Sequence, residues 1–336
     1  MTEKIKKSKN GCLWGVILLQ GFIIIVLIFA VAGAVSLTGA IKNLEAERDM
    51  GADEYPRLKE TWSWGRGDAK AVRIPLKGMI LLRKEGGFFS SSEGSASRAL
   101  ESLRRATNDP DVKCVILDID SGGGGITASD IIYHAVKEFK ETDPDRKVVA
   151  VFGDLAASGA YYIAAAADYI VARPTTITGS IGVLMQSVNI KNLADKMGVR
   201  DVTLKSGPNK DMMNPLKDMT SEQTNLLQEV INSLYERFAV IVSENREIPL
   251  DEVKTFADGR IFTAQQALDL KLVDQIGYWR DALEQSEELV GENLKVFRYE
   301  KEFTMSDFFR GSLSMNPLAR VFPPLNESRF MYLWQP

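Results

Sequence analysis

Residues Val151 to Leu184 read VFGDLAASGAYYIAAAADYIVARPTTITGSIGVL, and the rest of the chain is interpreted around this stretch. It begins as an apolar strand, breaks at Gly153 and Asp154, and places Ser158 directly before an alanine-rich helical pattern. The free N–H groups at a helix N-terminus and its positive dipole favour a developing oxyanion, so Ser158 is a candidate nucleophile. The alternative is that Ser158 only caps the helix, as serine often does.

The composition narrows the class of protein. The chain has 336 residues, of which 45% are hydrophobic and 26% charged, enough for a sizeable core and an additional segment. The net charge is -4 and the body carries no basic stripe, so we expect no nucleic-acid partner. Two cysteines and one histidine supply too few soft ligands for a zinc site, and we expect neither a metal nor a cofactor.

The N-terminal region predicts a membrane anchor. Residues 13–37 are uncharged and consist mainly of Leu, Ile, Val, Phe and Ala, enough to cross about 30 Å of hydrocarbon as a helix. Lysines concentrated in residues 1–12 place that end in the cytoplasm, and the body on the extracytoplasmic side of the cell membrane. A cleaved signal peptide is the alternative, because residues 32–34 read AGA. The apolar stretch is, however, longer than the roughly 7 to 15 residues typical of such peptides.

After a linker over residues 38–70, the body alternates strand and helix patterns and predicts an α/β fold. We expect the main domain over 71–300 and an apolar C-terminal tail over 301–336 that docks on a neighbour. Strands are expected at 72–82, 113–120, 147–152 and 169–172, helices at 98–106 and 128–141, and a tight loop at 178–182. Capping boxes are expected at Thr127 with Asp130, Thr220 with Gln223, and Thr263 with Gln266.

Four consecutive glycines, Gly122 to Gly125, follow the strand that ends near Asp120. Their freedom lets the backbone approach a ligand with its N–H groups. A phosphate cradle is one interpretation, although the lysine-serine ending of a P-loop and the dinucleotide spacing are both missing. A flexible turn is the second interpretation. In the third interpretation the loop supplies one N–H donor of an oxyanion hole, and the residue after Ser158 supplies the other.

A serine nucleophile needs a base, and the only histidine, His134, lies in a helix pattern without a carboxylate that would orient it. We interpret His134 as a surface or packing residue. Lysine can act as a base when its surroundings keep it neutral. Five lysines follow Ser158 within reach, and composition does not distinguish them: Lys191, Lys196, Lys205, Lys210 and Lys217.

Five motifs occur in one order: DSGGGGITAS at 120–129, ASGAYYIA at 157–164, TGSIG at 178–182, KSGPNKD at 205–211 and DGRIFTAQQAL at 258–268. Together they resemble the signal peptide peptidase A family of membrane-anchored serine proteases, over residues 70 to 285. The order and spacing of five motifs are far more specific than any one of them. The five motifs occur in a single copy, which resembles the short form of the family rather than the form with two tandem repeats.

The resemblance implies a Clp protease and crotonase type of fold, a β-spiral of repeated strand-strand-helix units preceded by one transmembrane helix. It also implies a Ser-Lys dyad. The implied catalytic residues are Ser158 as nucleophile, Lys210 as general base and Ser180 as the residue that orients the lysine, and the implied oxyanion donors are Gly123, Gly124 and Gly159. Gly122 stands where the family usually has proline, which loosens this turn.

The activity implied is cleavage of remnant signal peptides and other short unfolded peptides outside the cytoplasm. The family also forms rings of identical subunits, with an octamer as one candidate size, in which Lys210 would serve Ser158 of an adjacent chain. Two other functions remain as alternatives. One is a crotonase-like acyl-thioester enzyme, and the other is a non-catalytic peptide-binding membrane scaffold of the same fold.

Overall fold

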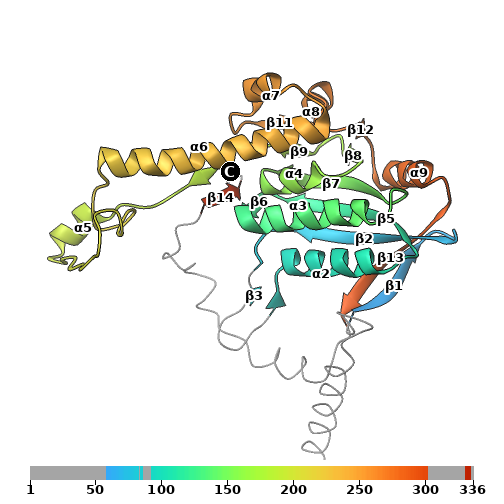
Figure 1. Ribbon diagram of the computed structural model, residues 1–336, viewed down its shortest axis with the longest axis horizontal. Helices are drawn as coiled ribbons and strands as arrows, with labels where there is room; N and C mark the ends of the chain where they lie inside the picture. The colour runs from blue at the N-terminus through green and yellow to red at the C-terminus, as the bar shows by residue number, and fades with distance from the viewer. Residues whose placement is uncertain (1–57, 83, 86–91, 302–329, 334–336) are drawn as a thin grey trace, which may run out of the picture. The chain divides into compact units, whose positions relative to one another are not determined.

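The computed structural model describes residues 58–82, 84–85, 92–301 and 330–333 (Figure 1). The expected membrane span at 13–37 and Cys12 lie outside these residues. Among the helices from Ser95 to Val290, none is both long and apolar enough to cross a bilayer.

The centre of the fold is a sheet of nine strands with the order β1-β13-β2-β5-β7-β8-β12, to which β9 and β11 are attached beside β7. The core strands β2, β5, β7 and β8 are parallel to one another. Nearly every residue of β5 is buried, as is typical of a parallel strand covered on both faces. The strands of this sheet are β1 Leu58–Trp64, β2 Ala69–Lys77, β5 Val112–Ser121, β7 Lys147–Ala157, β8 Tyr169–Ala172, β9 Ile177–Gly179, β11 Ile261–Thr263, β12 Gln275–Ile276 and β13 Leu294–Lys301.

Helices cover both faces of this sheet, because successive side chains of β5 point alternately into a core on one face and a core on the other. Val115 and Leu117 belong to the core shared with α2 (Ser95–Asn108), α3 (Ile126–Glu141) and α4 (Gly159–Ala164). Cys114 and Ile116 belong to the core on the opposite face, under α9 (Trp279–Val290). Cys114 is therefore a packed side chain, and burial raises the pKa of its thiol to about 12.

Two smaller sheets complete the strands. The sheet β10-β14-β6 joins β10 (Leu184–Met185), β14 (Phe330–Leu333) and β6 (Gly123–Gly125). The strands β3 (Lys84–Glu85) and β4 (Ser92–Glu93) pair with each other. The remaining helices are α5 Lys191–Lys196, α6 Ser221–Arg246, α7 Leu250–Phe256 and α8 Ala264–Asp269.

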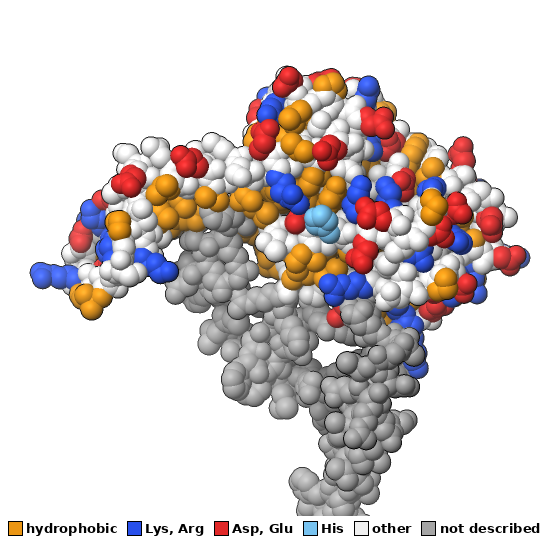
Figure 2. Space-filling view, in the orientation of Figure 1, with side chains coloured by type: hydrophobic (Ala, Val, Ile, Leu, Met, Phe, Trp, Pro, Cys, Tyr) orange, Lys and Arg blue, Asp and Glu red, His pale blue; other side chains and the backbone are white. Residues whose placement is uncertain are grey.

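A long segment that contains only the short helix α5 connects β10 to α6. We call residues 186–220 the arm. Figure 1 shows α5, which lies in the arm, beyond the N-terminal end of α6. All four fully buried residues of α6 fall between Phe238 and Val242, so only its C-terminal half is anchored in the core. The apolar side chains of α6 are consequently only partly covered: Val230 is exposed, and Figure 2 shows hydrophobic side chains gathered along this helix.

Most local expectations are confirmed. The α/β class, the strands near 113–120 and 169–172, and the capping boxes at Thr220 and Thr263 are all present. The capping box predicted at Thr127 is wrong, because α3 begins at Ile126, two residues earlier than expected, and its N-cap is Gly125, which has no side chain to bond. The expected repetition of strand-strand-helix units remains a prediction.

Four further differences concern strands. β7 does not break at Gly153 and Asp154 but continues to Ala157. The stretch 178–182, expected as a loop, begins inside β9, which pairs with β7. β1 lies within the segment expected as a linker, and β14 lies within the expected tail, where it pairs with β6 of its own chain.

Candidate active site

Ser158 occupies a strained turn between β7 and α4. Its φ is 55° and its ψ is -120°, a combination that costs of order 1–3 kcal/mol for a residue with a side chain. The residue is 1% exposed, its N–H donates to the carbonyl of Gly179 at 2.8 Å, and its own carbonyl accepts from Tyr162. Strain of this kind, held in place by buried neighbours, is typical of functional positions.

Ser180 lies beside Ser158. The parallel strands β7 and β9 pair Ala157 with Gly179, so the two serines directly follow the same pair of residues. Ser180 also has a positive φ of 50°, is buried, and donates its N–H to the carbonyl of Arg260 at 2.8 Å. The structure therefore brings together two of the three predicted catalytic residues.

The glycine loop packs against the Ser158 turn. Gly123 has a φ of +97°, and a Cβ at this position would lie 2.7 Å from the amide nitrogen of Gly159. A Cβ on Gly159 would lie 3.2 Å from the amide nitrogen of Gly124. The three glycines predicted to supply oxyanion donors are thus in contact. The N–H of Gly123 already donates to the Ser121 hydroxyl at 3.1 Å, so Gly124 and Gly159 are the better placed donors of the three.

A main-chain carbonyl of the same chain lies against these glycines. β14 pairs antiparallel with β6, matching Tyr332 with Gly124, and pairs with β10 on its other side. The Tyr332 carbonyl oxygen would be 2.2 Å from a Cβ on Gly123 and 3.1 Å from one on Gly159. It therefore lies where a peptide carbonyl would meet the expected oxyanion donors.

The Tyr332 side chain fills an aromatic pocket. Its ring stacks on Tyr162 with centroids 5.0 Å apart and meets Phe238 at 4.8 Å, and its hydroxyl donates to the carbonyl of Leu234 at 3.0 Å. Burial raises the pKa of this hydroxyl far above its ordinary value. The position of β14 could not be predicted from the sequence, because both partner strands, β6 and β10, lie far earlier in the chain and β6 consists only of glycine.

A separate pocket of about 320 Å³ begins at Ser180 and is closed by the β14 residue Leu333. Its walls are residues 182–184, three residues of α6 and the turn that follows α7. Ser158 does not line it. The pocket therefore contacts β14 at Leu333 and lies beside Ser180 rather than over Ser158.

The third predicted catalytic residue, Lys210, lies on the arm. Its side chain is exposed, and its N–H donates to the carbonyl of Gly207 at 3.3 Å. Within the described ranges, no hydrogen bond or ion pair joins Lys210 to Ser158 or Ser180. One copy of the chain does not by itself assemble all three residues.

Ion pairs distinguish the lysines that composition could not. Lys191 pairs with Asp218, Lys205 with Asp211, and Lys217 with both Asp201 and Asp211. Hydrogen bonds to these carboxylates raise the pKa of Lys191 and of Lys217, which makes both poorer bases. Lys196 and Lys210 have no such ion pair in the part of the chain that the structure describes.

His134, pale blue in Figure 2, is exposed on α3 and lies near Asp130 and Arg237. This agrees with its interpretation as a surface residue. The neighbouring cluster was not anticipated: Tyr162 donates to Asp130 at 2.6 Å, and Arg237 of α6 donates to the same carboxylate at 2.7 Å. The cluster ties α6 to α3 and α4 behind the Tyr332 pocket.

Comparison with known proteins identifies the family. The profile of Peptidase family S49 matches residues 140–293. A protein of Enterococcus faecium with the provisional name signal peptide peptidase SppA is 39% identical over 226 residues, which cover 67% of this chain and 65% of that protein. A Synechocystis protein with the provisional name protease slr0021 is 38% identical over 66% of this chain and 75% of its own length.

A more distant relative is the chloroplastic serine protease SPPA of Arabidopsis thaliana, 30% identical over 70% of this chain but only 35% of its own. The Ser158 turn, β9 and the arm all lie within the segment that the family profile covers. On the strength of the profile match and of a relative matched over three quarters of its length, this chain belongs to peptidase family S49.

Proposed function

We propose that this protein is a serine endopeptidase that cleaves short extended peptides with Ser158 as its nucleophile. The observation that carries the proposal is the position of the Tyr332 carbonyl, which lies against Gly123 and Gly159 beside the strained Ser158 turn. A site that receives one peptide carbonyl in this way can receive another. Membership of a peptidase family supports the same reaction.

The reaction follows from the groups present. The Ser158 hydroxyl attacks the peptide carbonyl carbon while its proton passes to a neutral lysine amine. The N–H groups of Gly124 and Gly159 stabilise the oxyanion of the tetrahedral intermediate. The protonated lysine then gives its proton to the leaving amine, which departs with its chain, and water repeats the sequence on the acyl-enzyme.

Lys210 is the lysine proposed as the base, with Ser180 orienting it. Two features support this choice: Lys191, Lys205 and Lys217 are held by carboxylates, and Ser180 is paired in register beside Ser158. Because Lys210 lies on the arm, we propose that it acts on Ser158 of an adjacent subunit in a ring of identical chains. The octamer is one candidate size.

Substrate would bind as an added strand between β6 and β10, the place that β14 takes. Main-chain hydrogen bonds in such a groove select extended, unfolded segments. We propose remnant signal peptides as substrates, with the domain held on the extracytoplasmic side of the cell membrane by residues 13–37 and their lipid contacts.

The test is hydrolysis of a fluorogenic peptide by the detergent-solubilised full chain, with Ser158→Ala and Lys210→Ala as variants. Activity should be lost in both, and in the wild type it should rise with pH as the base loses its proton. Activity that survives Lys210→Ala would reassign the base. A folded wild type inert to peptides and to a serine-reactive probe would refute the peptidase proposal.

Mixing the two inactive variants tests the shared site. In a mixed ring, Ser158 of a Lys210→Ala chain can meet Lys210 of a Ser158→Ala chain, so part of the activity should return. A mixed oligomer that stays wholly inactive would show that the two residues act within one chain.

A further inference from the structure

The arm holds its shape with polar contacts rather than with a core. In the described arm, only Ala194 is a buried apolar residue, while Val202 and Leu204 are 88% and 97% exposed. Hydrophobic burial therefore cannot fix the turn that carries Lys210. Some other interaction must define where that amine points.

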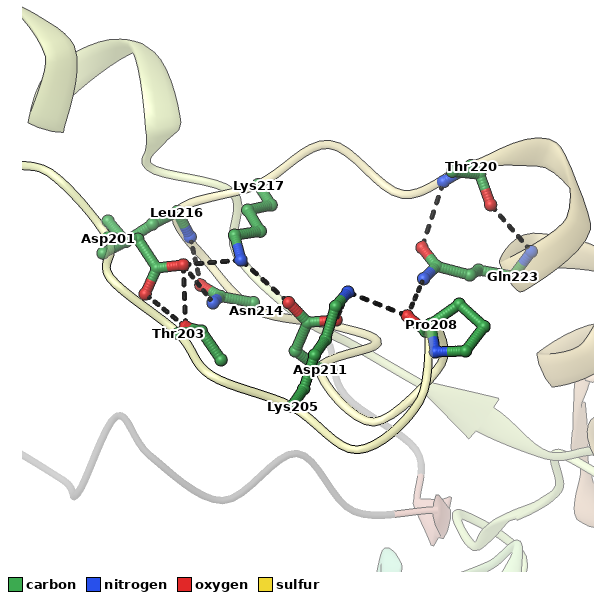
Figure 3. Close-up of polar contacts among 10 residues, drawn as sticks. All are labelled: Asp201, Thr203, Lys205, Pro208, Asp211, Asn214, Leu216, Lys217, Thr220 and Gln223. Atoms are coloured by element: carbon green, nitrogen blue, oxygen red, sulfur yellow. Dashed lines mark hydrogen bonds and ion pairs between the residues drawn. The ribbon is translucent and has the colours of Figure 1, made fainter.

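Charged side chains supply this interaction (Figure 3). Asp211 accepts from Lys205 at 2.6 Å and from Lys217 at 2.8 Å, and Lys217 also pairs with Asp201 at 2.6 Å. Asp211 is the least exposed member, with 10% of its side chain accessible. The two lysines lie on either side of the Lys210 turn in sequence, so their shared carboxylate closes that turn.

The same network reaches the start of α6. Lys205 also donates to the carbonyl of Pro208 at 2.9 Å, and Gln223 donates to that carbonyl at 3.4 Å. Gln223 is at the same time the partner of Thr220 in the capping box of α6. The Lys210 turn is thus connected to a helix whose far half is anchored in the core.

We propose that Asp211 is a positioning residue for the Lys210 amine. It binds the lysines on both sides, Lys205 and Lys217, and thereby closes the turn so that Lys210 alone among the three presents a side chain without an ion pair in the described residues. The hydrogen bonds from Lys205 and Lys217 also lower the pKa of Asp211 to about 2, so its charge persists at any pH at which the enzyme would work.

This inference rests on the proposed role of Lys210 as base, and the experiment separates the two. Asp211→Asn keeps the shape of the side chain but removes the charge that holds both lysines. We expect kcat for a fluorogenic peptide to fall about 10- to 100-fold, as for other small misplacements of a catalytic group, while KM stays within about twofold. Asp211→Glu, which restores the charge, should recover a large part of kcat.

The matched control is Asp218→Asn. Asp218 is also an arm carboxylate paired with a lysine, but its partner Lys191 belongs to α5 and not to the Lys210 turn. Its loss should leave kcat within about twofold of the wild type. Size-exclusion mass and melting temperature, measured for every variant, should match the wild type.

The outcomes are distinct. If Lys210→Ala remains active, the proposed base is wrong and the inference is overturned with it. If Lys210→Ala is inactive but Asp211→Asn equals Asp218→Asn in kcat, the base stands and the positioning role of Asp211 is refuted. If Asp211→Asn loses activity only because the oligomer dissociates, Asp211 is an assembly residue and the positioning role is refuted as well.

Discussion

The strand β14 gives the most direct test of the site. Tyr332 is fully buried in the pocket of Tyr162 and Phe238, and its carbonyl lies at the expected oxyanion donors, so β14 and a peptide substrate should compete for one groove. Removing the contacts that the Tyr332 side chain makes should therefore weaken the binding of β14 in the groove and make the groove accessible to substrate. A substitution at Tyr332 changes no residue of β6, β10 or the Ser158 turn.

The size of the effect follows from the contacts. Tyr332→Ala removes a fully buried aromatic side chain and its hydrogen bond to Leu234, at a cost of about 3 kcal/mol to the docking of the strand. That energy corresponds to a shift of about 100-fold in the ratio of docked to undocked β14. Tyr332→Phe loses only the hydroxyl, about 1 kcal/mol, and should shift the ratio about fivefold.

The assay is kcat/KM for a short fluorogenic peptide. We expect it to increase from the wild type to Tyr332→Phe and further to Tyr332→Ala, up to the limit at which the groove is always open. An unchanged kcat/KM in a folded Tyr332→Ala protein would show that β14 does not occupy the groove in solution. A decrease would show that Tyr332 supports the catalytic geometry instead of blocking it.

Three further predictions concern the glycines, the arm and α6. Gly123→Ala and Gly291→Ala both force a residue with a Cβ into a positive φ, at a cost of about 1 kcal/mol. Only at Gly123 does the Cβ meet backbone atoms of the site, so only Gly123→Ala should abolish peptide hydrolysis, and equal activities would contradict the assignment of this loop. The pKa of Asp211 is lowered to about 2 in the folded protein, so its stabilisation of the arm is complete above its unfolded value near 4 and is lost as the pH falls toward 2. Hydrogen exchange at residues 201–217, corrected for intrinsic rates, should accelerate over that window, and protection that is constant from pH 5 to 2 would refute the role of the ion pairs. Tyr162→Phe removes the hydroxyl that donates to Asp130 at 2.6 Å and should lower the free energy of unfolding in urea by about 1–2 kcal/mol. A loss below about 0.3 kcal/mol would mean that the cluster does not hold α6 to the core.

The sequence predicts well those features that depend on neighbouring residues. The capping boxes of α6 and α8 need only a threonine and a glutamine three residues apart, and both are present. The run from Cys114 to Ile119, apolar except for Asp118, predicts a buried strand, and β5 is one. The position of Ser158 between a strand and a helix is likewise local, although its positive φ is not visible in the sequence.

Features that depend on distant partners were missed or misread. Gly153 predicts a break in β7, yet the strand continues to Ala157. The reason for a glycine at this position is close packing, since a Cβ there would lie 2.9 Å from the side chain of Asp120 on the adjacent strand. The glycine at this position allows two strands to approach rather than ending one. The stretch 178–182 was expected as a loop because its pairing with β7 and β11 depends on residues more than 20 and 80 positions away.

The candidate site divides in the same way. Ser158, Ser180 and the glycine loop could be predicted from motifs, and the sheet register places them side by side. The roles of Asp211 and Tyr332 could not, because each depends on contacts that the arm and β14 make only in the folded chain. The role of Lys210 as base remains a prediction, because no contact in the described residues joins it to Ser158 or Ser180.

The sheet order also has a consequence for how the protein is made. β13, Leu294–Lys301, is inserted between β1 and β2, whose residues are synthesised more than 200 positions earlier. The sheet cannot close until that late strand has left the ribosome, so the first half of the domain must wait with the edge of β2 uncovered. We therefore expect the sheet of this domain to be completed only after most of the chain has been made.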